Sequence, residues 1–411
     1  MTASRKPNHA LIINAYSFKN AGDAAIMLST ARLMRDLGAR TVELSTRYDD
    51  APEYARFGVP VISALIPFPA RQEGEQRAIR AARALYYLAA ALICCIVAPA
   101  SRPSARRLAT LLIPTTREIV GRYDTLVIAG GGYMYSSKRT VNLSLWHSLI
   151  TIRFGQIFTD EAIMMPQSIG PVTRRLDARL LRWALARVTV VARETLSLER
   201  SLPSVKDLSV RIVDDVAFIP GVDVRRRATG GENVVRIVTM DWRWSTSVSA
   251  DAMDRYIRTL AGVADRLTQM GKSVVLGGHS ALPEHDQDDV AIAHLVASQA
   301  TCPVEVDPDC SVDHLYEAYS QCSLVIGTRL HSCIMAISVG TPAIALAYQE
   351  KSRGVLELAG IPDAVTPVDT VDQEYLINLA THFMEAPADQ WTSIADVINA
   401  RIRMAYMEML K

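Results

Sequence analysis

Along most of the chain, short apolar runs rich in β-branched residues alternate with longer stretches in which apolar residues recur at helical spacing. The stretches 24–37, 176–186 and 252–270 show this spacing clearly and predict amphipathic helices. Strands that alternate with helices build parallel sheets covered on both faces, so the predicted fold class is α/β. Strands are predicted at the apolar runs 10–14, 41–44, 125–129, 162–165, 188–192, 234–240, 273–276, 304–306, 324–327 and 343–347.

One segment interrupts this alternation and divides the chain. Residues 220–233, PGVDVRRRATGGEN, are rich in Gly, Pro and Arg and lack periodicity, which indicates an interdomain linker. The chain of 411 residues is long enough for two domains of about 200 residues each. We predict an N-terminal Rossmann-like domain at 1–222, a C-terminal Rossmann-like domain at 232–389 and a helical tail at 390–411.

Composition restricts the class of protein. Hydrophobic residues make up 49% and charged residues 21% of the chain, as is typical of a globular protein. A formal net charge of +1 provides no basic field for a dedicated nucleic-acid binder. The six cysteines form no CxxC pair, and the N-terminus lacks the apolar core of a signal peptide. We therefore expect reduced thiols and a cytoplasmic protein.

One hydrophobic segment offers a candidate membrane contact. The uncharged run 84–100 is about 17 residues long, contains Pro99 and barely reaches the length of a bilayer span. An interfacial helix that docks on anionic lipid at the inner face of the cell membrane and a buried helix of the α/β domain are equally compatible with it. Arginines flank the run on both sides, at positions 77, 80, 83, 102, 106 and 107.

In open parallel sheets, ligands bind beyond the carboxyl ends of the strands. Within the segment 324–354, a predicted strand leads through Arg329 and His331 into a helix, and Lys351 follows the next strand. A helix N-terminus offers unpaired N–H groups and a positive dipole end. With three basic side chains around it, the segment predicts an anion site, and a phosphate is the expected anion. The competing interpretation is an ordinary βαβ unit with polar loop residues.

Two strand ends in the first half carry candidate residues of a different kind. Asp23 precedes a helical run and serves either as its N-cap or as a general acid or base. Gly131 and Gly132 belong to a triple glycine, which lets the backbone approach a ligand closely. The pattern is not GxGxxG, so a dinucleotide site is poorly supported.

Two further strand ends add hydrogen-bonding and charged groups. Gln167 and Ser168 stand in a loop bounded by prolines, which we predict to be rigid. Arg193 follows the strand 188–192, where it binds an anion or pairs with Glu194. These residues are candidates for contacts with an acceptor or a donor substrate.

The second half places aromatic and imidazole side chains after its strands. Trp242 and Trp244 bracket Arg243, an arrangement that suits sugar stacking or anion binding and is equally common at a domain interface.

His279 follows the strand 273–276. With His285, Asp286 and Asp289 it invites a metal interpretation, but the spacing matches no standard site, so no metal is predicted.

Eight motifs occur in a fixed order: NAGDAAI at 20–26, GGG at 130–132, MPQSIGP at 165–171, ARETLS at 192–197, DDVAF at 214–218, GGHS at 277–280, TRLHS at 328–332 and GTPAIALAYQEKSRG at 340–354. Together they resemble the polysaccharide pyruvyl transferase family. The resemblance covers roughly residues 10–360, and each motif alone is weakly specific. It implies a fold like that of GT-B glycosyltransferases, with two Rossmann-like domains facing each other across a cleft.

The family resemblance implies a reaction and roles for named residues. It implies transfer of the enolpyruvyl carbons of phosphoenolpyruvate onto a sugar as a cyclic ketal, with release of phosphate and no further cofactor. Asp23, reaching from the N-terminal domain, and His331 are implied as the catalytic pair. Arg193 and Lys351 are implied as ligands of phosphoenolpyruvate, and Arg329 and Arg243 are weaker candidates for the same anion.

Two other functions compete with this hypothesis. A conventional GT-B glycosyltransferase needs a nucleotide-recognition loop, and the sequence shows no clear one. A non-catalytic membrane-associated scaffold would not be expected to retain Asp23, Arg193, His331 and Lys351 together. The expected acceptor is a sugar on a glycan, a glycolipid or a lipid-linked oligosaccharide, and the sequence does not distinguish among these.

Overall fold

The computed structural model describes residues 7–67, 77–136, 142–196, 199, 208–227, 233–243, 250–282, 287–387 and 389–411. Contacts between Cα atoms divide the chain into two compact units. Unit 1 comprises residues 1–17, 30–215 and 403–411, and unit 2 comprises residues 18–29 and 216–402. Two helices, α1 (Ala21–Asp36) and α14 (Gln390–Met409), therefore contribute residues to both units.

Unit 1 contains a parallel sheet of five strands in the order β3-β2-β1-β4-β6. Because β1 lies between β2 and β4, the chain reverses its direction of winding there, and the carboxyl ends of β1 and β4 form the switch point of a Rossmann sheet. The strands are β1 (His9–Ala15), β2 (Thr41–Thr46), β3 (Val61–Ile62), β4 (Thr125–Ile128) and β6 (Glu161–Met164).

A second sheet of unit 1, in the order β5-β7-β8-β9, was not predicted. The segment 166–171 was predicted as a loop but contains β7 (Gln167–Ile169). The triple glycine at 130–132 was not predicted to be a strand, but β5 (Gly131–Met134) begins in it. These strands join β8 (Val190–Ala192) and β9 (Val210–Ile212). Their glycines and polar residues hide them from a search for apolar runs, and their burial comes from long-range pairing. Gly131 has a φ of 122°, which favours glycine at this position.

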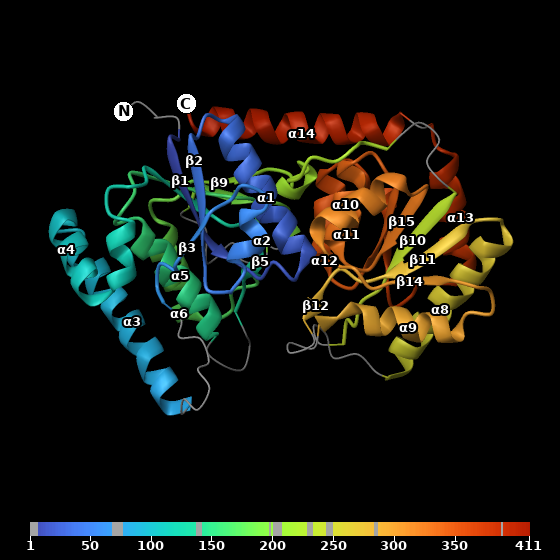
Figure 1. Ribbon diagram of the computed structural model, residues 1–411, viewed down its shortest axis with the longest axis horizontal. Coiled ribbons are helices and arrows are strands. Elements are labelled where there is room, and N and C mark those ends of the chain that lie inside the picture. Colours follow the sequence, from blue (N-terminus) through green and yellow to red (C-terminus); the bar gives the residue numbers. More distant parts are fainter. Residues whose placement is uncertain are drawn as a thin grey trace. The chain divides into compact units, whose positions relative to one another are not determined.

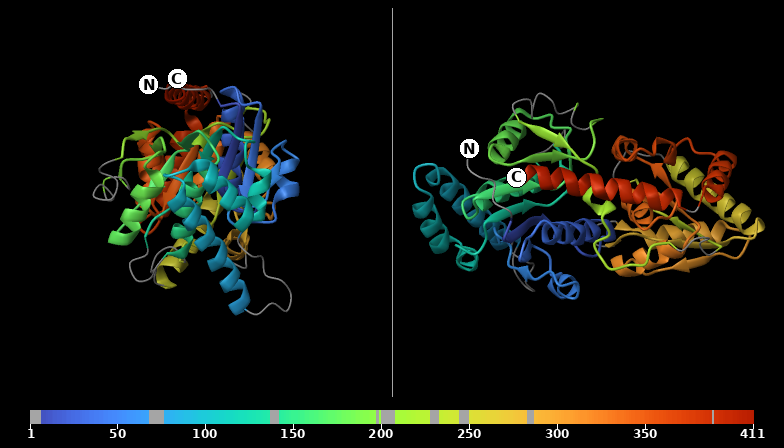
Figure 2. Two further views of the ribbon diagram at one scale, coloured as in Figure 1. Left: turned by 90° about the vertical axis from the view of Figure 1, so that its left-hand side faces the viewer. Right: turned by 90° about the horizontal axis from the view of Figure 1, so that it is seen from above.

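Helices surround the sheets of unit 1 (Figures 1 and 2). The core joins strand residues such as Leu126 and Ile128 to helix residues such as Leu149 and Leu181. The last turns of α14 are anchored to this unit, because the Tyr406 hydroxyl donates to the Met164 carbonyl at 2.8 Å. The other helices are α2 (Ala51–Ala55), α3 (Arg77–Val97), α4 (Arg102–Leu112), α5 (Leu143–Gly155) and α6 (Arg175–Leu185).

Unit 2 contains a parallel sheet of six strands in the order β14-β11-β10-β15-β16-β17. Taken along the chain, this is the strand order of a complete Rossmann sheet, with its switch point between β10 and β15. The strands are β10 (Val234–Val238), β11 (Ser273–Gly277), β14 (Glu305–Asp307), β15 (Leu324–Gly327), β16 (Ala343–Ala347) and β17 (Val365–Pro367).

Helices pack on this sheet on both faces (Figure 1). They are α8 (Ala250–Gln269), α9 (Asp289–Gln299), α10 (Val312–Gln321), α11 (Leu330–Ser338), α12 (Glu350–Leu358) and α13 (Gln373–Glu385). All ten strands predicted from apolar runs are present, with bounds that differ by at most two residues at either end. The α/β fold class is confirmed.

The hydrophobic run 84–100 lies mostly in α3, which packs one face into the core of unit 1 through Ala90, Ala91, Cys94 and Cys95. Among the residues that the structure describes, no helix is both long enough and apolar enough to cross a membrane.

Candidate functional site

The candidate site of unit 2 lies at its switch point, where β10 and β15 are neighbours. β15 ends at Gly327, and α11 begins at Leu330. A Cβ at Gly327 would lie 2.1 Å from the Ser332 hydroxyl oxygen, so the tight connection requires glycine. The Ser332 hydroxyl in turn donates to the Arg329 carbonyl at 2.6 Å. This turn fixes the start of α11, on which His331 stands.

Arg329 is held by a buried carboxylate. Its Nε and Nη2 atoms donate to the two carboxylate oxygens of Asp289 at 2.9 and 2.8 Å. Burial alone would lower the pKa of Arg329, but the Asp289 carboxylate raises it, so the guanidinium stays charged. Asp289 also accepts the backbone N–H of His279 at 3.2 Å. The sequence analysis considered Asp289 only in the metal interpretation, and its pairing with Arg329 was not predicted.

The start of α1 brings Asp23 to this same region. Asn20 caps the helix, because its side-chain oxygen accepts the N–H groups of Gly22 at 3.1 Å and Asp23 at 3.4 Å. The interpretation of Asp23 as the N-cap is therefore wrong, and its carboxylate lies in the first helical turn. The negative charge of Asp23 contributes to the raised pKa of Arg329.

His331 lies directly against this helix start. A Cβ added to Gly22 would come within 2.7 Å of the His331 Nδ1 atom, so only glycine leaves room for the imidazole. Residues 18–29 belong to unit 2, and Asp23 therefore shares a unit with His331, whereas the sequence analysis placed it in the other domain. The backbone N–H of Ala21 donates to the His279 carbonyl at 3.1 Å, which fixes the helix start to the loop after β11.

His279 is buried beneath this cluster. Its ring stacks on Tyr319 with centroids 6.4 Å apart and planes 4° from parallel. Burial lowers its pKa well below the usual value, and the neighbouring charges of His331, Arg329 and Arg236 lower it further. The imidazole is therefore neutral, and its Nε2 atom has no hydrogen-bond partner among the residues that the structure describes.

An ionic network also contacts Tyr319. The Arg236 guanidinium lies 5.9 Å from the Tyr319 ring centroid and donates to Asp307 at 2.8 Å. A ring nitrogen of His314 lies 2.6 Å from the same Asp307 carboxylate. Burial raises the pKa of Asp307, but the hydrogen bonds from His314 and Arg236 outweigh it and bring the pKa to about 2. None of these four residues was predicted, because no periodic pattern reports their pairing.

The remaining predicted residues of unit 2 differ in burial. Lys351 lies in the first turn of α12 and is partly exposed. Trp242 is buried and packs edge-on against Tyr256, with centroids 6.2 Å apart. Arg243 is half exposed and donates to Asp241 at 2.6 Å. Trp244 lies outside the described residues.

The predicted residues of unit 1 form a second cluster. Arg193 is fully buried, and its guanidinium donates to Asp215 at 2.5 Å and to the Ser168 hydroxyl at 2.9 Å. Asp215, which accepts the first of these hydrogen bonds, belongs to the DDVAF motif, to which the sequence analysis gave no role. The backbone N–H of Arg193 donates to the Gln167 carbonyl at 3.2 Å, which links the end of β8 to β7.

The triple glycine adjoins this second cluster. The Gly131 N–H donates to the Pro166 carbonyl at 3.3 Å, so β5 begins beside the turn that leads into β7. Gly132 follows in β5. Gln167 is completely buried, and its side-chain oxygen has no hydrogen-bond partner among the described residues.

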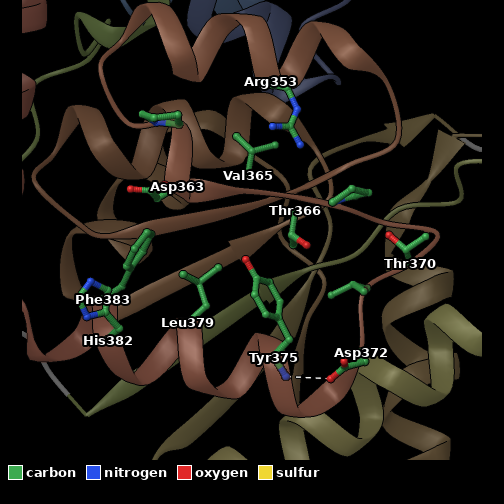
Figure 3. A pocket seen from close by; sticks show the side chains of 13 residues that line it. Arg353, Asp363, Val365, Thr366, Thr370, Asp372, Tyr375, Leu379, His382 and Phe383 are labelled. Atoms are coloured by element: carbon green, nitrogen blue, oxygen red, sulfur yellow. Dashed lines mark hydrogen bonds between the residues drawn. The ribbon is translucent and has the colours of Figure 1, made fainter.

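A separate cavity of about 730 Å³ lies along β17, between α12 and α13 (Figure 3). Figure 3 shows the Tyr375 hydroxyl directed toward the strand that carries Thr366, with Arg353 on the other side. The cavity contains none of the predicted site residues.

The described residues were also compared with the requirements of a metal site. In the described residues, no group of three or more His, Cys, Asp or Glu side chains could hold a metal ion. His285 and Asp286 lie outside the described residues.

The two Rossmann-like units and their switch-point residues define an α/β protein of the GT-B-like class. A UDP-GlcNAc 2-epimerase from Neisseria meningitidis aligns with a TM-score of 0.50 and 9% identity, over 98% of this chain and 99% of that chain. A glycosyltransferase from Rickettsia africae aligns with a TM-score of 0.52 and 10% identity, over 99% and 98% of the two chains. At such low identity the likeness shows the fold alone.

The chain belongs to the polysaccharide pyruvyl transferase family, whose sequence model matches residues 20–350. The amylovoran biosynthesis protein AmsJ of Erwinia amylovora is 23% identical over 276 residues. That match covers 61% of this chain and 63% of AmsJ.

Proposed function

We propose that this protein transfers the enolpyruvyl carbons of phosphoenolpyruvate onto two hydroxyls of one sugar residue, which forms a cyclic pyruvate ketal and releases phosphate. The observation that carries the proposal is the gathering of Asp23, Arg329 and His331 at the starts of two helices, at the switch point of unit 2. An acid, a base and a fixed positive charge at helix N-termini suit an anionic donor whose reaction needs proton transfer.

The proposed chemistry balances without an oxidant or a metal. A proton adds to the methylene carbon of phosphoenolpyruvate, and one sugar hydroxyl bonds to the cationic carbon that results. The bond from that carbon to the phosphate oxygen breaks, and a second hydroxyl of the same sugar closes the ring. The two hydroxyls lose two protons, of which one matches the proton gained by the new methyl group and the other leaves with phosphate.

We assign His331 as the acid at the donor and Asp23 as the base at the acceptor hydroxyl. An imidazole changes its protonation near neutral pH, which suits it to protonate a carbon and then recover the proton. The exchange of the two roles is the alternative assignment, and the pH dependence of kcat in the two single variants distinguishes them.

The cations divide into two kinds. Lys351, partly exposed at the start of α12, is proposed to bind the phosphate or the carboxylate of the donor. Arg329 is fixed by Asp289, so its charge contributes to a positive field at the site and it does not move with the ligand. Arg193 and Arg243 remain predicted donor ligands, although Asp215 and Asp241 already accept hydrogen bonds from them.

The acceptor is proposed to be a sugar on a polysaccharide precursor or glycolipid, carried by a lipid at the inner face of the cell membrane. Membership of the family supports a polysaccharide acceptor. The name of the relative AmsJ supports a place in exopolysaccharide biosynthesis.

Phosphate release and the mass of the product test the reaction. The protein is incubated with phosphoenolpyruvate and candidate glycans, and a ketal appears as a mass increase that requires both substrates. His331→Ala and Asp23→Asn are expected to lower kcat by at least about a hundredfold. The matched controls His294→Ala and Asp254→Asn alter exposed residues of α9 and α8 and are expected to retain activity. Turnover of a nucleotide sugar in place of phosphoenolpyruvate would refute the proposal.

A further inference from the structure

The helices α3 and α4 of unit 1 expose an apolar stripe that the fold leaves uncovered. On α3, the exposed fractions of Leu85, Ile93 and Ile96 are 67%, 49% and 75%. At about 100° per residue, the exposed large apolar residues of α3 lie within one arc of about 120°, on the side away from the buried face. We name this surface the α3 stripe; its members are Ile79, Ala82, Leu85, Tyr86, Ala89, Ile93 and Ile96.

The neighbouring helix extends this surface. Tyr86 donates from its hydroxyl to the Leu112 carbonyl of α4 at 3.3 Å, which ties the two helices together beside the stripe. Leu111 of α4 is 72% exposed. Figures 1 and 2 show that the N-terminal end of α3 extends past α5 and α6 of the same unit. Exposed contiguous apolar surface of this kind marks a binding surface.

The segment that contains α3 and α4 carries charges of one sign. Residues 77–117 contain seven arginines and neither aspartate nor glutamate. The chain has 44 Lys and Arg against 43 Asp and Glu, so 37 basic and 43 acidic residues remain outside this segment. A protein that is nearly neutral overall therefore concentrates positive charge on α3 and α4. Arg83 and Arg107 are exposed there, whereas Arg106 donates to the Ile157 carbonyl and fastens α4 to the unit.

We propose that the α3 stripe and its arginines dock unit 1 on an anionic lipid bilayer. An interfacial helix places its apolar face at the boundary of headgroups and acyl chains, and its cations pair with anionic headgroups. A second copy of the chain is a poor occupant, because a twofold contact would set arginine-rich surfaces against each other. Nucleic acid would leave the apolar stripe without a partner. The docking deepens the proposed function, since it would hold the enzyme at the membrane that carries a lipid-linked acceptor.

Flotation of the full chain with vesicles tests the docking. Vesicles of phosphatidylcholine and phosphatidylglycerol are expected to carry the protein upward, and vesicles of phosphatidylcholine alone are not. Leu85→Gln with Ile96→Gln should weaken binding by about tenfold or more, because glutamine removes apolar contact. Arg83→Glu with Arg107→Glu should do the same and remove most of the salt dependence.

Matched controls lie on α6 of the same unit. Leu176 is 52% exposed and Arg179 is exposed, so Leu176→Gln and Arg179→Glu should leave flotation unchanged. Absence of flotation with anionic vesicles at low salt would overturn the docking, as would stripe variants that bind normally. Light scattering adds a further outcome, because a dimer that Leu85→Gln and Ile96→Gln dissociate would assign the stripe to a second copy. Phosphate release with a soluble acceptor should persist in every stripe variant, so a failure of docking is distinguishable from a failure of the proposed reaction.

Discussion

Breaking the buried ion pair between Asp289 and Arg329 is expected to destabilise unit 2 strongly. The two hydrogen bonds measure 2.9 and 2.8 Å, and the side chains are 1% and 10% exposed. In Asp289→Asn the guanidinium stays buried but loses its countercharge, which costs about 3–5 kcal/mol. Arg329→Met leaves the carboxylate with backbone donors such as the His279 N–H and should cost a similar amount.

The double variant separates the pair's interaction from the desolvation of each charge. With both charges removed, neither partner is left uncompensated, so the loss should fall short of the sum of the single losses by about 2 kcal/mol or more. Urea unfolding followed by circular dichroism measures each free energy of unfolding, and the two units are fitted as separate transitions. Arg353→Met provides the control, because its pair with Glu357 is exposed at 3.9 Å and should contribute under about 1 kcal/mol. Additive single losses, or a loss below about 1 kcal/mol for Asp289→Asn, would refute the reasoning.

Three further predictions concern the site and its surroundings. Gly22→Ala should lower kcat by about tenfold or more, because the new methyl group displaces the His331 ring. Circular dichroism should show normal secondary structure. An unchanged kcat would show that the contact between Gly22 and His331 does not matter for the reaction. Asp307 has a pKa of about 2, below the value of about 4 in an unfolded chain, so its contribution to stability is present above pH 4 and lost as the pH falls toward 2. Asp307→Asn should therefore reduce the change in the urea-unfolding midpoint between pH 4 and pH 2. A midpoint that depends on pH as in the unaltered protein would contradict the linkage. Burial raises the pKa of the Cys95 thiol to about 12, so iodoacetamide at pH 8 should label it only after unfolding, as peptide mass spectrometry would show.

The fold was accessible from the sequence because buried parallel strands are continuous apolar runs. Leu324–Gly327 and Ala343–Ala347 were predicted with the bounds that the structure shows. The second sheet of unit 1 was missed because Gln167–Ile169 and Gly131–Met134 carry polar residues and glycines, although Gln167 is completely buried. Their strand character arises from pairing with distant segments, which a local pattern does not report.

In the candidate site too, residues with a local sequence signal were predicted, whereas pairs of residues distant in the chain were not. His331 and Arg329 were predicted from their place after a strand, which is a local signal. Asp289 and Asp215 were not assigned as partners of Arg329 and Arg193, because each pair joins residues far apart in the chain. A carboxylate near a helix start looks the same in sequence whether it caps the helix or neutralises a buried guanidinium.

The assignment of residues 18–29 to unit 2 makes the juxtaposition of Asp23 and His331 a property of one unit. Asn20 caps α1, the Ala21 N–H is bound to the His279 carbonyl, and Gly22 lies against the His331 ring. These contacts all lie within unit 2, so a movement of unit 1 does not by itself separate the proposed acid from the proposed base. Variants at unit 1 residues such as Arg193 should therefore change KM for a substrate without shifting the pH profile of kcat, if Asp23 and His331 act as proposed. A shifted profile in a folded Arg193→Lys protein would show that the catalytic pair depends on both units.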